Sequence, residues 1–308
     1  MAHIDNAQLL FDFSQIGEAA MKLAELLGDI DLKLYAFDRI HCGAWWNFPA
    51  VNSPFARLFH VLEGEALLRH GGREWPLVPG RLVLSPPFTP VDYLCRGGFE
   101  NYYAIFTCRV AGGLDLFSLG EMDWSSEADA LTPGLFAKLH ELNPGRGLKF
   151  TDPYRPDYNS SIWASGPNGM SAEAALGTDG ILRLLLSRFV GSFRLKAGGE
   201  GQEAAVRFLP SLQYMERHLD EPLTLGDLAK TAHLHPTYFS DSFFRAVGTR
   251  PIAFLNRKRL ERAQLLLLTT GMELKEIAAV CGFKDATYFH KVFKARTGLT
   301  PVEYRSDA

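Results

Sequence analysis

The sequence has few cysteines, no long apolar run and no large excess of charge of one sign. Its four cysteines form no CxxC pair, which argues against a zinc site and against a disulfide framework. The longest aliphatic run, Leu265–Leu268, is far shorter than the roughly 20 residues of a membrane-spanning helix. The N-terminus lacks the basic and apolar regions of a signal peptide. We therefore expect a soluble, cytoplasmic protein with no membrane partner.

The composition is that of a folded globular chain, and its charge is unevenly divided. The 308 residues are 47% hydrophobic and 22% charged, which excludes disordered, collagen-like and coiled-coil chains. A chain of this length usually forms two domains. The net charge is −3, but residues 1–200 hold 17 basic and 23 acidic side chains, whereas residues 201–308 hold 15 and 12. Such asymmetry indicates that the basic C-terminal part faces nucleic acid.

Short strands separated by Gly and Pro turns dominate residues 32–109. Gly71-Gly72 has the form of a two-residue hairpin turn, and Pro79-Gly80 forms a second turn. This spacing is typical of a small antiparallel barrel or sandwich. The predicted strands are Ala56–Leu62, Glu65–His70, Arg73–Val78 and Arg81–Ser85.

Helical patterns follow the strands. Thr132-Pro133 predicts the start of a helix that runs toward Leu142. Gly180–Arg194 has helical periodicity, and its apolar stripe either pairs two chains or packs on the chain's own barrel. Ala197–Gly201 is the best linker candidate, so we expect one domain over residues 1–198 and another over residues 199–308.

The last hundred residues contain an internal repeat. One copy is TLGDLAKTAHLHPTYFSDSFFRAVGTRP, Thr224–Pro251, and the other is ELKEIAAVCGFKDATYFHKVFKARTGLTP, Glu273–Pro301. Matching residues lie 49 apart before the turn and 50 apart after it, so one residue is inserted in the second turn. Two copies in the basic part of the chain argue against a purely structural helical bundle.

Each copy has the features of a helix-turn-helix. A small residue, Ala229 or Ala278, stands where two helices must cross closely, and a turn follows at His233-Leu234 or Gly282-Phe283. Gly282 suits a left-handed turn conformation, and His tolerates that conformation better than β-branched residues do. Further local signals are Pro236 in the first turn of a helix, the helix cap Asp285, the i, i+4 anchors Phe239/Phe243 and Phe289/Phe293, and the capping box Thr300–Glu303.

Residues 205–305 resemble the DNA-binding domain of the AraC/XylS family. The resemblance rests on RLERAQLLLLTTGMELKEIAAVCGFKDATYFHKVFKARTGLTPVEYR, Arg259–Arg305. It implies that a long central helix joins two helix-turn-helix units, whose recognition helices enter successive major-groove segments about 34 Å apart. The partner implied is double-stranded DNA.

The expected DNA contacts lie on the faces of the two recognition helices that the Phe anchors leave free. In the first unit they are His235, Thr237, Tyr238, Ser240, Asp241 and Arg245. In the second they are Lys284, Thr287, Tyr288, His290, Lys291 and Lys294, with Arg296 adding charge. Asp241 can accept a hydrogen bond from cytosine N4, or it can form a salt bridge with Arg245 and contact no base.

The central helix adds Arg257, Lys258, Arg259 and Arg262, and we include Arg259 and Arg262 among the DNA contacts. Lys258 and Arg262 are like charges at i, i+4, which destabilise an isolated helix by about 0.2–0.5 kcal/mol. A phosphate partner would offset that cost, and a solvated face is the alternative.

Residues 35–105 resemble the cupin-type sensor domain that precedes this DNA-binding domain in sugar-responsive family members. The resemblance rests on FHVLEGEALLRHGGREWPLVPGRLVLSPPFTP, Phe59–Pro90. The metal-binding His pattern is incomplete, because Leu62 follows His60 two residues later and Val91 stands where a later His is usual. We therefore expect neither a metal nor a cofactor. The side chains expected to hold a small molecule are Trp45, Trp46, Arg57, His60, Glu63 and Tyr93.

Together these features predict an all-β, cupin-like barrel with flanking helices, followed by an all-α double helix-turn-helix domain. The expected function is that of a homodimeric transcriptional regulator, an activator, which responds to a sugar-like effector and contacts RNA polymerase. It is not expected to be an enzyme. The alternatives are a cupin enzyme with an appended helical domain, and a non-sensing DNA-binding dimer.

Overall fold

The computed structural model describes residues 25–155, 158, 162, 170–196 and 206–306. The predicted linker Ala197–Gly201 lies outside these residues. The N-terminal part consists mainly of strands: β1 (Asp31–Gly43), β2 (Phe48–Val51), β3 (Ala56–Gly64), β4 (Ala66–His70), β5 (Arg73–Leu77), β6 (Arg81–Ser85), β7 (Val91–Leu94), β8 (Gly98–Val110), β9 (Leu114–Asp115), β10 (Gly120–Glu121), β11 (Ser125–Glu127) and β12 (Arg194–Leu195). Its helices are η1 (Ala111–Gly113), α2 (Leu116–Leu119), α3 (Thr132–Leu142) and α5 (Ala172–Val190).

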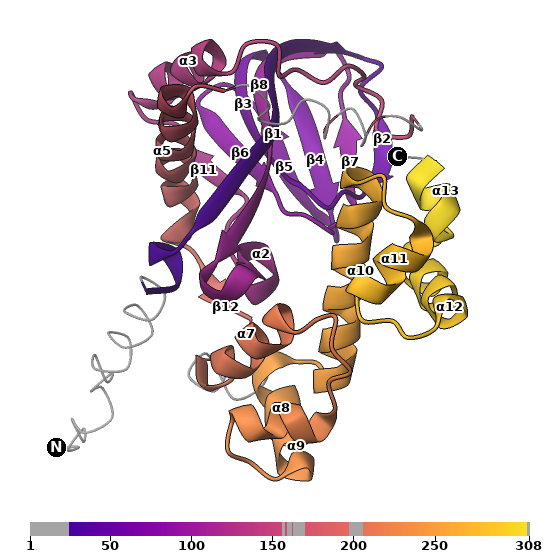
Figure 1. Ribbon diagram of the computed structural model, residues 1–308. Helices are drawn as coiled ribbons and strands as arrows, with labels where there is room; N and C mark the ends of the chain where they lie inside the picture. The colour runs from indigo at the N-terminus through magenta and orange to yellow at the C-terminus, as the bar shows by residue number, and fades with distance from the viewer. Residues whose placement is uncertain (1–24, 156–157, 159–161, 163–169, 197–205, 307–308) are drawn as a thin grey trace, which may run out of the picture.

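The main strands form two antiparallel sheets. The larger sheet has the order β1-β8-β3-β6-β11, with β9 paired to β8, and the smaller has the order β2-β7-β4-β5. Figure 1 shows α3 and α5 beside the larger sheet, on the side away from the smaller one. The predicted all-β domain with flanking helices is confirmed, and the hairpin at Gly71-Gly72 joins β4 to β5 as expected.

Alternation along the strands sends side chains to two separate cores. On β3, Arg57 and Phe59 point between the two sheets, whereas Leu58 and His60 point toward the helices. The helix-facing core also takes the apolar stripe of α5, namely Leu182, Leu185, Leu186 and Phe189. Of the two alternatives for Gly180–Arg194, the structure therefore shows packing on the chain's own sheet and α3.

The C-terminal part is helical, as predicted. Its helices are α7 (Leu209–Arg217), α8 (Leu225–Thr231), α9 (Pro236–Val247), α10 (Pro251–Thr269), α11 (Leu274–Val280), α12 (Ala286–Thr297) and α13 (Pro301–Ser306). In Figure 1 the long helix α10 connects a lower group, α7–α9, to a group on the right, α11–α13.

The two helix-turn-helix units are embedded differently. The buried apolar residues of the first unit, including Phe239 and Phe243, belong to the same contiguous cluster as the helix-facing core of the β domain. The second unit has its own cluster around Phe289 and Phe293, which shares α10 residues such as Leu260. The first unit is thus joined to the β domain by packing, whereas the second packs on α10.

Candidate functional site

The turn of each helix-turn-helix has the predicted left-handed residue. His233 has φ 54° and Gly282 has φ 77°. At Gly282 a glycine is required for a second reason, since a Cβ there would lie 2.1 Å from the carbonyl oxygen of Leu219. The small residues Ala229 and Ala278 are buried at the helix crossings, as expected.

Local capping fixes where the helices of the two units begin. Thr224 and Asp227 form a reciprocal capping box at α8. Asp285 accepts a hydrogen bond from the Thr287 N–H at 2.8 Å, so α12 begins where the sequence predicted. Thr300 and Glu303 form the expected capping box at α13.

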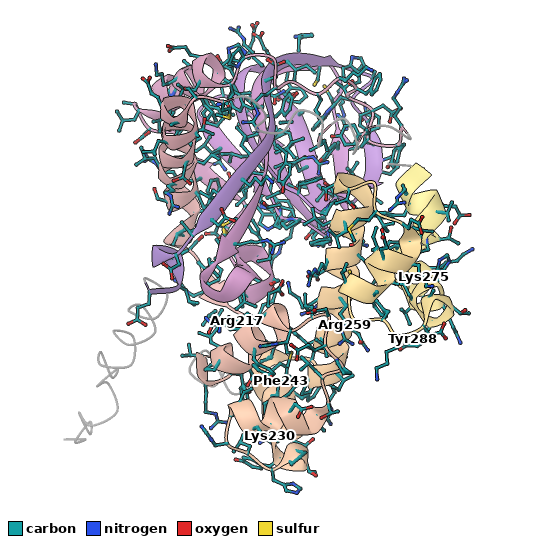
Figure 2. All side chains as sticks on the ribbon, viewed as in Figure 1. Arg217, Lys230, Phe243, Arg259, Lys275 and Tyr288 are labelled. Carbon is teal, nitrogen blue, oxygen red and sulfur yellow. The ribbon has the colours of Figure 1, made fainter. Side chains whose placement is uncertain are left out.

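Four buried phenylalanines orient the recognition helices. Phe239, Phe243, Phe289 and Phe293 are fully buried, and Phe208 packs edge-on against the first pair. Because these anchors occupy one face of α9 and of α12, the opposite faces are left to solvent. Figure 2 shows Phe243 within the first unit and Tyr288 at the surface of the second.

The exposed face of α9 contains the residues that the sequence singled out. His235, Thr237, Tyr238, Asp241 and Arg245 are exposed, and Ser240 is half-buried. This face carries little free positive charge.

Asp241 forms an ion pair with Arg250, which also donates a hydrogen bond to Ser240 at 3.1 Å. Asp241 thus forms a salt bridge, one of its two expected roles, and Arg250 is a partner that the sequence did not identify. Arg250 was not among the predicted DNA contacts. It lies just before α10, and its guanidinium also stacks over the Phe244 ring at 5.0 Å.

The exposed face of α12 is strongly basic. Lys284, Thr287, Tyr288, Lys291 and Lys294 are exposed, and His290 is half-buried. Within the part of the chain that the structure describes, no carboxylate lies within ion-pair distance of these three lysines. They remain available to phosphate groups, unlike Arg250 of the first unit.

Arg259 is buried, which departs from its predicted place at the DNA. Its Nε donates to the Leu219 carbonyl at 2.8 Å and its Nη2 donates to the Glu221 carbonyl at 2.5 Å. The side chain therefore binds the chain just after α7 to the central helix, beside the turn at Gly282. Figure 2 shows Arg259 on α10, between the two units.

The other charges of α10 point toward the β domain. Lys258 is buried, and its Nζ donates to Glu261 at 2.9 Å and to Ser118 of α2 at 3.1 Å. Arg262 is half-buried and lines a small cavity together with Pro54 and Phe88 of the β domain. Because the β domain covers this side of the helix, the expected phosphate contact of Arg262 has no support in the structure.

The contact between the domains contains a cluster of carboxylates around Lys258. Glu216 of α7 lies 3.9 Å from the amine. Burial raises the pKa of Asp115 to about 6, against the opposing attraction of Lys258. Burial likewise raises the pKa of Glu216. This cluster was not predictable from the sequence, because Asp115, Glu216 and Lys258 come from three separate parts of the chain.

A small cavity of about 40 Å³ lies between the two sheets. Trp46, Arg57 and Tyr93, three of the six predicted ligand contacts, line it together. Trp46 stacks on Tyr93 with 4.6 Å between ring centroids and an interplanar angle of 7°.

The other three predicted ligand contacts lie elsewhere. Trp45 is half exposed and packs edge-on against Phe48. His60 points to the other side of the sheet, where its ring packs on Phe136, because residues of β3 alternate between faces. Glu63 is exposed near the end of β3. Within the described residues, no group of three His, Cys, Asp or Glu is placed to hold a metal ion.

Sequence reasoning missed Thr151 and three larger polar side chains of the cavity. Asn101 and Tyr103 come from the inward face of β8, and Tyr158 comes from the chain that follows α3. Strand alternation would have found the first two had β8 been delimited, whereas nothing marked Tyr158 within a segment rich in Pro, Gly and Asn.

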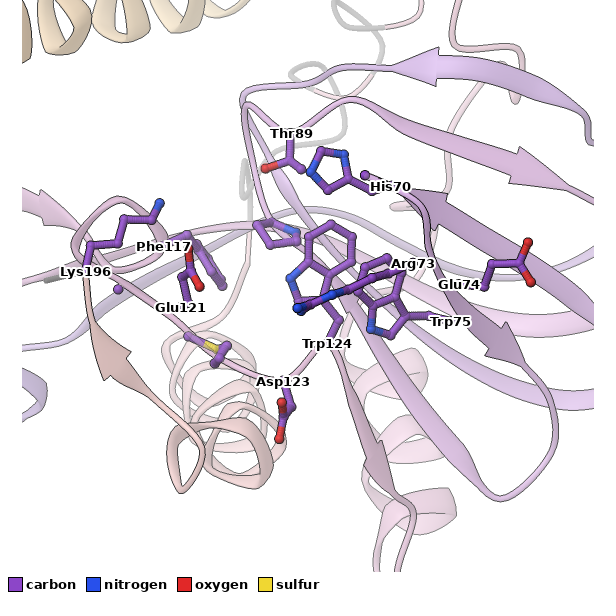
Figure 3. Close-up of a pocket in the computed structure, with 14 residues that line it drawn as sticks. His70, Arg73, Glu74, Trp75, Thr89, Phe117, Glu121, Asp123, Trp124 and Lys196 are labelled. Carbon is purple, nitrogen blue, oxygen red and sulfur yellow. The ribbon is translucent and has the colours of Figure 1, made fainter. Parts of the chain in front are cut away.

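A larger, open cleft of about 700 Å³ lies beside the β4–β5 hairpin. One wall is a stack of rings in which Trp124 lies between His70 and Trp75. Figure 3 shows this stack facing Phe117, Glu121 and Lys196 across the cleft.

In the described part of the chain, no helix has the length and apolar character needed to cross a bilayer.

Comparisons with known proteins find several transcriptional regulators that are similar to this chain. A family model described as a helix-turn-helix domain matches residues 228–307. The arabinose operon regulatory protein of Salmonella typhimurium is 33% identical over 250 residues, which cover 80% of this chain and 82% of that protein. YisR of Bacillus subtilis, an uncharacterized HTH-type transcriptional regulator, is 37% identical over 93 residues, 30% of this chain and 32% of that protein. The solved DNA-binding domain of AdpA, a global transcriptional factor in complex with a target DNA, is 27% identical with a TM-score of 0.31 and covers 32% of this chain and 89% of that one.

Proposed function

The chain belongs to the AraC/XylS family of DNA-binding transcriptional regulators, and on that premise we propose a division of labour between its two parts. Residues 199–308 bind an operator through α9 and α12, and residues 1–198 form a cupin-type domain that senses a small metabolite. The family resemblance favours a transcriptional activator that contacts RNA polymerase. We assign no enzymatic activity to either part.

Operator binding is supported best by the similarity of two exposed helix faces, which belong to two units joined by one long helix. α9 and α12 each turn a buried Phe pair inward and a polar face outward, and α10 joins the two units. A single chain built in this way can enter two successive major-groove segments. Sequence discrimination is assigned to His235, Thr237, Tyr238 and Ser240 of the first unit and to Thr287, Tyr288 and His290 of the second.

The test is a selection of bound genomic fragments followed by a gel-shift salt titration on the enriched sequence. We expect the affinity for that sequence to fall by about 10²-fold or more between 50 and 200 mM salt, since phosphate contacts release counterions. A flat salt profile, or no enriched sequence, would contradict operator binding.

The effector is proposed to bind in the cavity between the sheets, in contact with Trp46, Arg57 and Tyr93. Aromatic rings and a few convergent polar groups are the usual lining of small-molecule sites. A carbohydrate is the class that the family resemblance favours. A panel of sugars added to the full chain should raise its melting temperature for the compound that binds, because binding to the native state alone stabilises it by mass action.

The two alternatives predict different outcomes of simple measurements. A cupin enzyme would retain a stoichiometric metal ion, which metal analysis of the purified protein would detect. A non-sensing DNA-binding dimer would show no ligand-induced stabilisation with any metabolite.

Coupling between the two parts is proposed to run through the contact of α2 with α10. The Lys258 amine of α10 donates a hydrogen bond to the Ser118 hydroxyl of α2, and Gly112 of η1 packs against Gln213 of α7. An effector changes operator occupancy only if it binds two arrangements of these domains with different affinity.

A homodimer is proposed to form through the outer face of α5. The inner face packs on the chain's own sheet, but Leu176 and Leu184 are 76% and 54% exposed on the other face. Sedimentation of the full chain and of Leu184→Glu tests the assignment. We expect the variant to dissociate to monomers. A variant that remains a dimer would show that the interface does not include Leu184.

A further inference from the structure

Arg57 is a buried cation in the space between the two sheets. Its side chain comes from β3 and is only 5% exposed. Its Nη2 donates to the Tyr158 hydroxyl at 3.4 Å, and its guanidinium lies 6.0 Å from the centre of the same ring. These are weak contacts for a full positive charge removed from water.

Among the residues that the structure describes, no acidic side chain accompanies this charge. The residues that line the cavity include no Asp and no Glu, and within the described ranges Arg57 forms no ion pair. A buried charge without a counter-ion is costly, so native proteins pair such groups or use them to bind something.

Three polar atoms at this cavity also have no hydrogen-bond partner among the described residues. They are the Nε of Arg57, the hydroxyl of Tyr93 and the side-chain oxygen of Asn101. The first two are hydrogen-bond donors, and the fork of the guanidinium matches the two oxygens of a carboxylate. The Asn101 oxygen can accept a hydrogen bond from a hydroxyl next to that carboxylate.

We propose that the effector carries a carboxylate, which pairs with Arg57 and accepts a hydrogen bond from Tyr93. The inference rests on the proposed function, in which this cavity holds the effector, and it narrows the effector from a neutral sugar to an acidic one, such as a sugar acid. The free volume of about 40 Å³ accommodates the carboxylate but not a whole sugar ring. The stack of Trp46 on Tyr93 therefore opens when the body of the effector enters.

The first experiment compares matched pairs of ligands on the full chain. The probes are D-galacturonate with D-galactose and D-glucuronate with D-glucose, since each pair differs only in one oxidised carbon. A carboxylate is expected to raise the melting temperature by about 2–4 °C or more at millimolar concentration, and its neutral partner to have little effect. Arg57→Met should abolish the difference within the pair.

A neutral sugar that stabilises the wild type and Arg57→Met equally would overturn the inference while leaving effector sensing in place. If none of the probes binds, a second experiment, which does not depend on the identity of the ligand, tests the role of Arg57.

The second experiment measures the stability of Arg57→Met without ligand. If the charge is retained for an absent anion, its removal should raise the melting temperature of the free protein by about 2–4 °C. Arg146→Met is the matched control, because Arg146 is equally buried but donates to the Asn143 side chain at 2.6 Å and to the Leu34 carbonyl.

The control should lower the melting temperature, since it leaves buried acceptors without a donor. If Arg57→Met also lowers it, Arg57 is a structural residue and the proposal fails.

Discussion

Arg259 lies where the two helix-turn-helix units and the central helix meet. Its guanidinium donates to two carbonyl oxygens in the segment after α7, and it lies beside the left-handed Gly282 of the other unit. A planar group with several donors suits this place, because it can donate to two backbone carbonyls at once. The residue thus fixes the geometry between the units from inside the protein.

Arg259→Met should lower the free energy of unfolding by about 2–3 kcal/mol, since two charge-assisted hydrogen bonds are lost and the Leu219 carbonyl loses its donor. Urea unfolding measures this change, with the exposed Arg296→Met as the control. Normal stability together with a uniform loss of DNA affinity would instead place Arg259 at a phosphate.

Asp241 is the one acidic residue on the exposed face of α9, and its pairing with Arg250 makes a prediction possible. Asp241→Asn removes a negative charge and frees Arg250 for a phosphate. Operator affinity should rise several-fold at low salt, and the salt slope should steepen by about one contact.

The same substitution in an Arg250→Met background should have no such effect, which isolates the pair. A fall in affinity confined to operators with one particular cytosine would show instead that Asp241 contacts a base.

Individual residue positions were predictable where one local rule decides them. The repeat and the Phe anchors identified the free faces of α9 and α12, and strand alternation is enough to place Arg57 and Phe59 on the same side of β3. Burial of Lys258 and Arg259 was not predictable. A basic helix face has the same sequence pattern whether it meets phosphate, solvent or a second domain, and only the docking of the two domains decides between them.

At the scale of elements, the two recognition helices differ in charge although they share a pattern. α12 presents Lys284, Lys291 and Lys294 without acidic partners in the described structure, whereas the charge beside α9 is partly neutralised by Asp241. We therefore expect non-specific attraction to DNA to come mainly from the second unit.

Lys291→Ala should weaken binding to all DNA sequences about equally and reduce the salt slope by about 1. Lys275→Ala on α11, also an exposed lysine of the second unit, is the matched control and should leave the slope nearly unchanged. Equal effects of both substitutions would mean that α12 is not the helix in the groove.

Element boundaries were predicted well where capping and turn chemistry are local. Pro236, Asp285 and Pro301 marked the starts of α9, α12 and α13, and Arg81–Ser85 matched β6. The start of α5 was missed by eight residues, because its cap Ser171 follows a stretch rich in Gly and Asn and its first turns expose their side chains. Amphipathic periodicity identifies a helix only where one face is buried.

At the scale of the whole molecule, the contact between the domains combines an apolar core with titratable groups. Asp115 faces Lys258 and Glu261 of α10 and lies near Arg109 of β8 and Glu216 of α7. Because the pKa of Asp115 is raised to about 6, its protonated form is favoured in the folded protein. The stability that this group contributes is complete below its ordinary pKa near 4 and is lost as the pH rises through about 6.

Asp115→Asn should therefore reduce the decline in stability between about pH 4 and pH 6. Asparagine can still accept the hydrogen bond from the Ser118 N–H that caps α2. Thermal unfolding across this pH range measures the effect, with the exposed Asp123→Asn as the control. An unchanged pH profile in Asp115→Asn would mean that Asp115 does not titrate in this range.

The separate cores of the two units affect how the DNA specificity of such a regulator can change. A substitution in the cluster around Phe289 and Phe293 disturbs α12 and α10 but leaves the packing between the β domain and the first unit intact. If α12 and the sensor act as proposed, the half of the operator bound by α12 can therefore change, or be redesigned, with little effect on effector response. The first unit, with α9, shares its core with the β domain, so on the same proposal changes in the specificity of α9 are constrained by the need to preserve signalling.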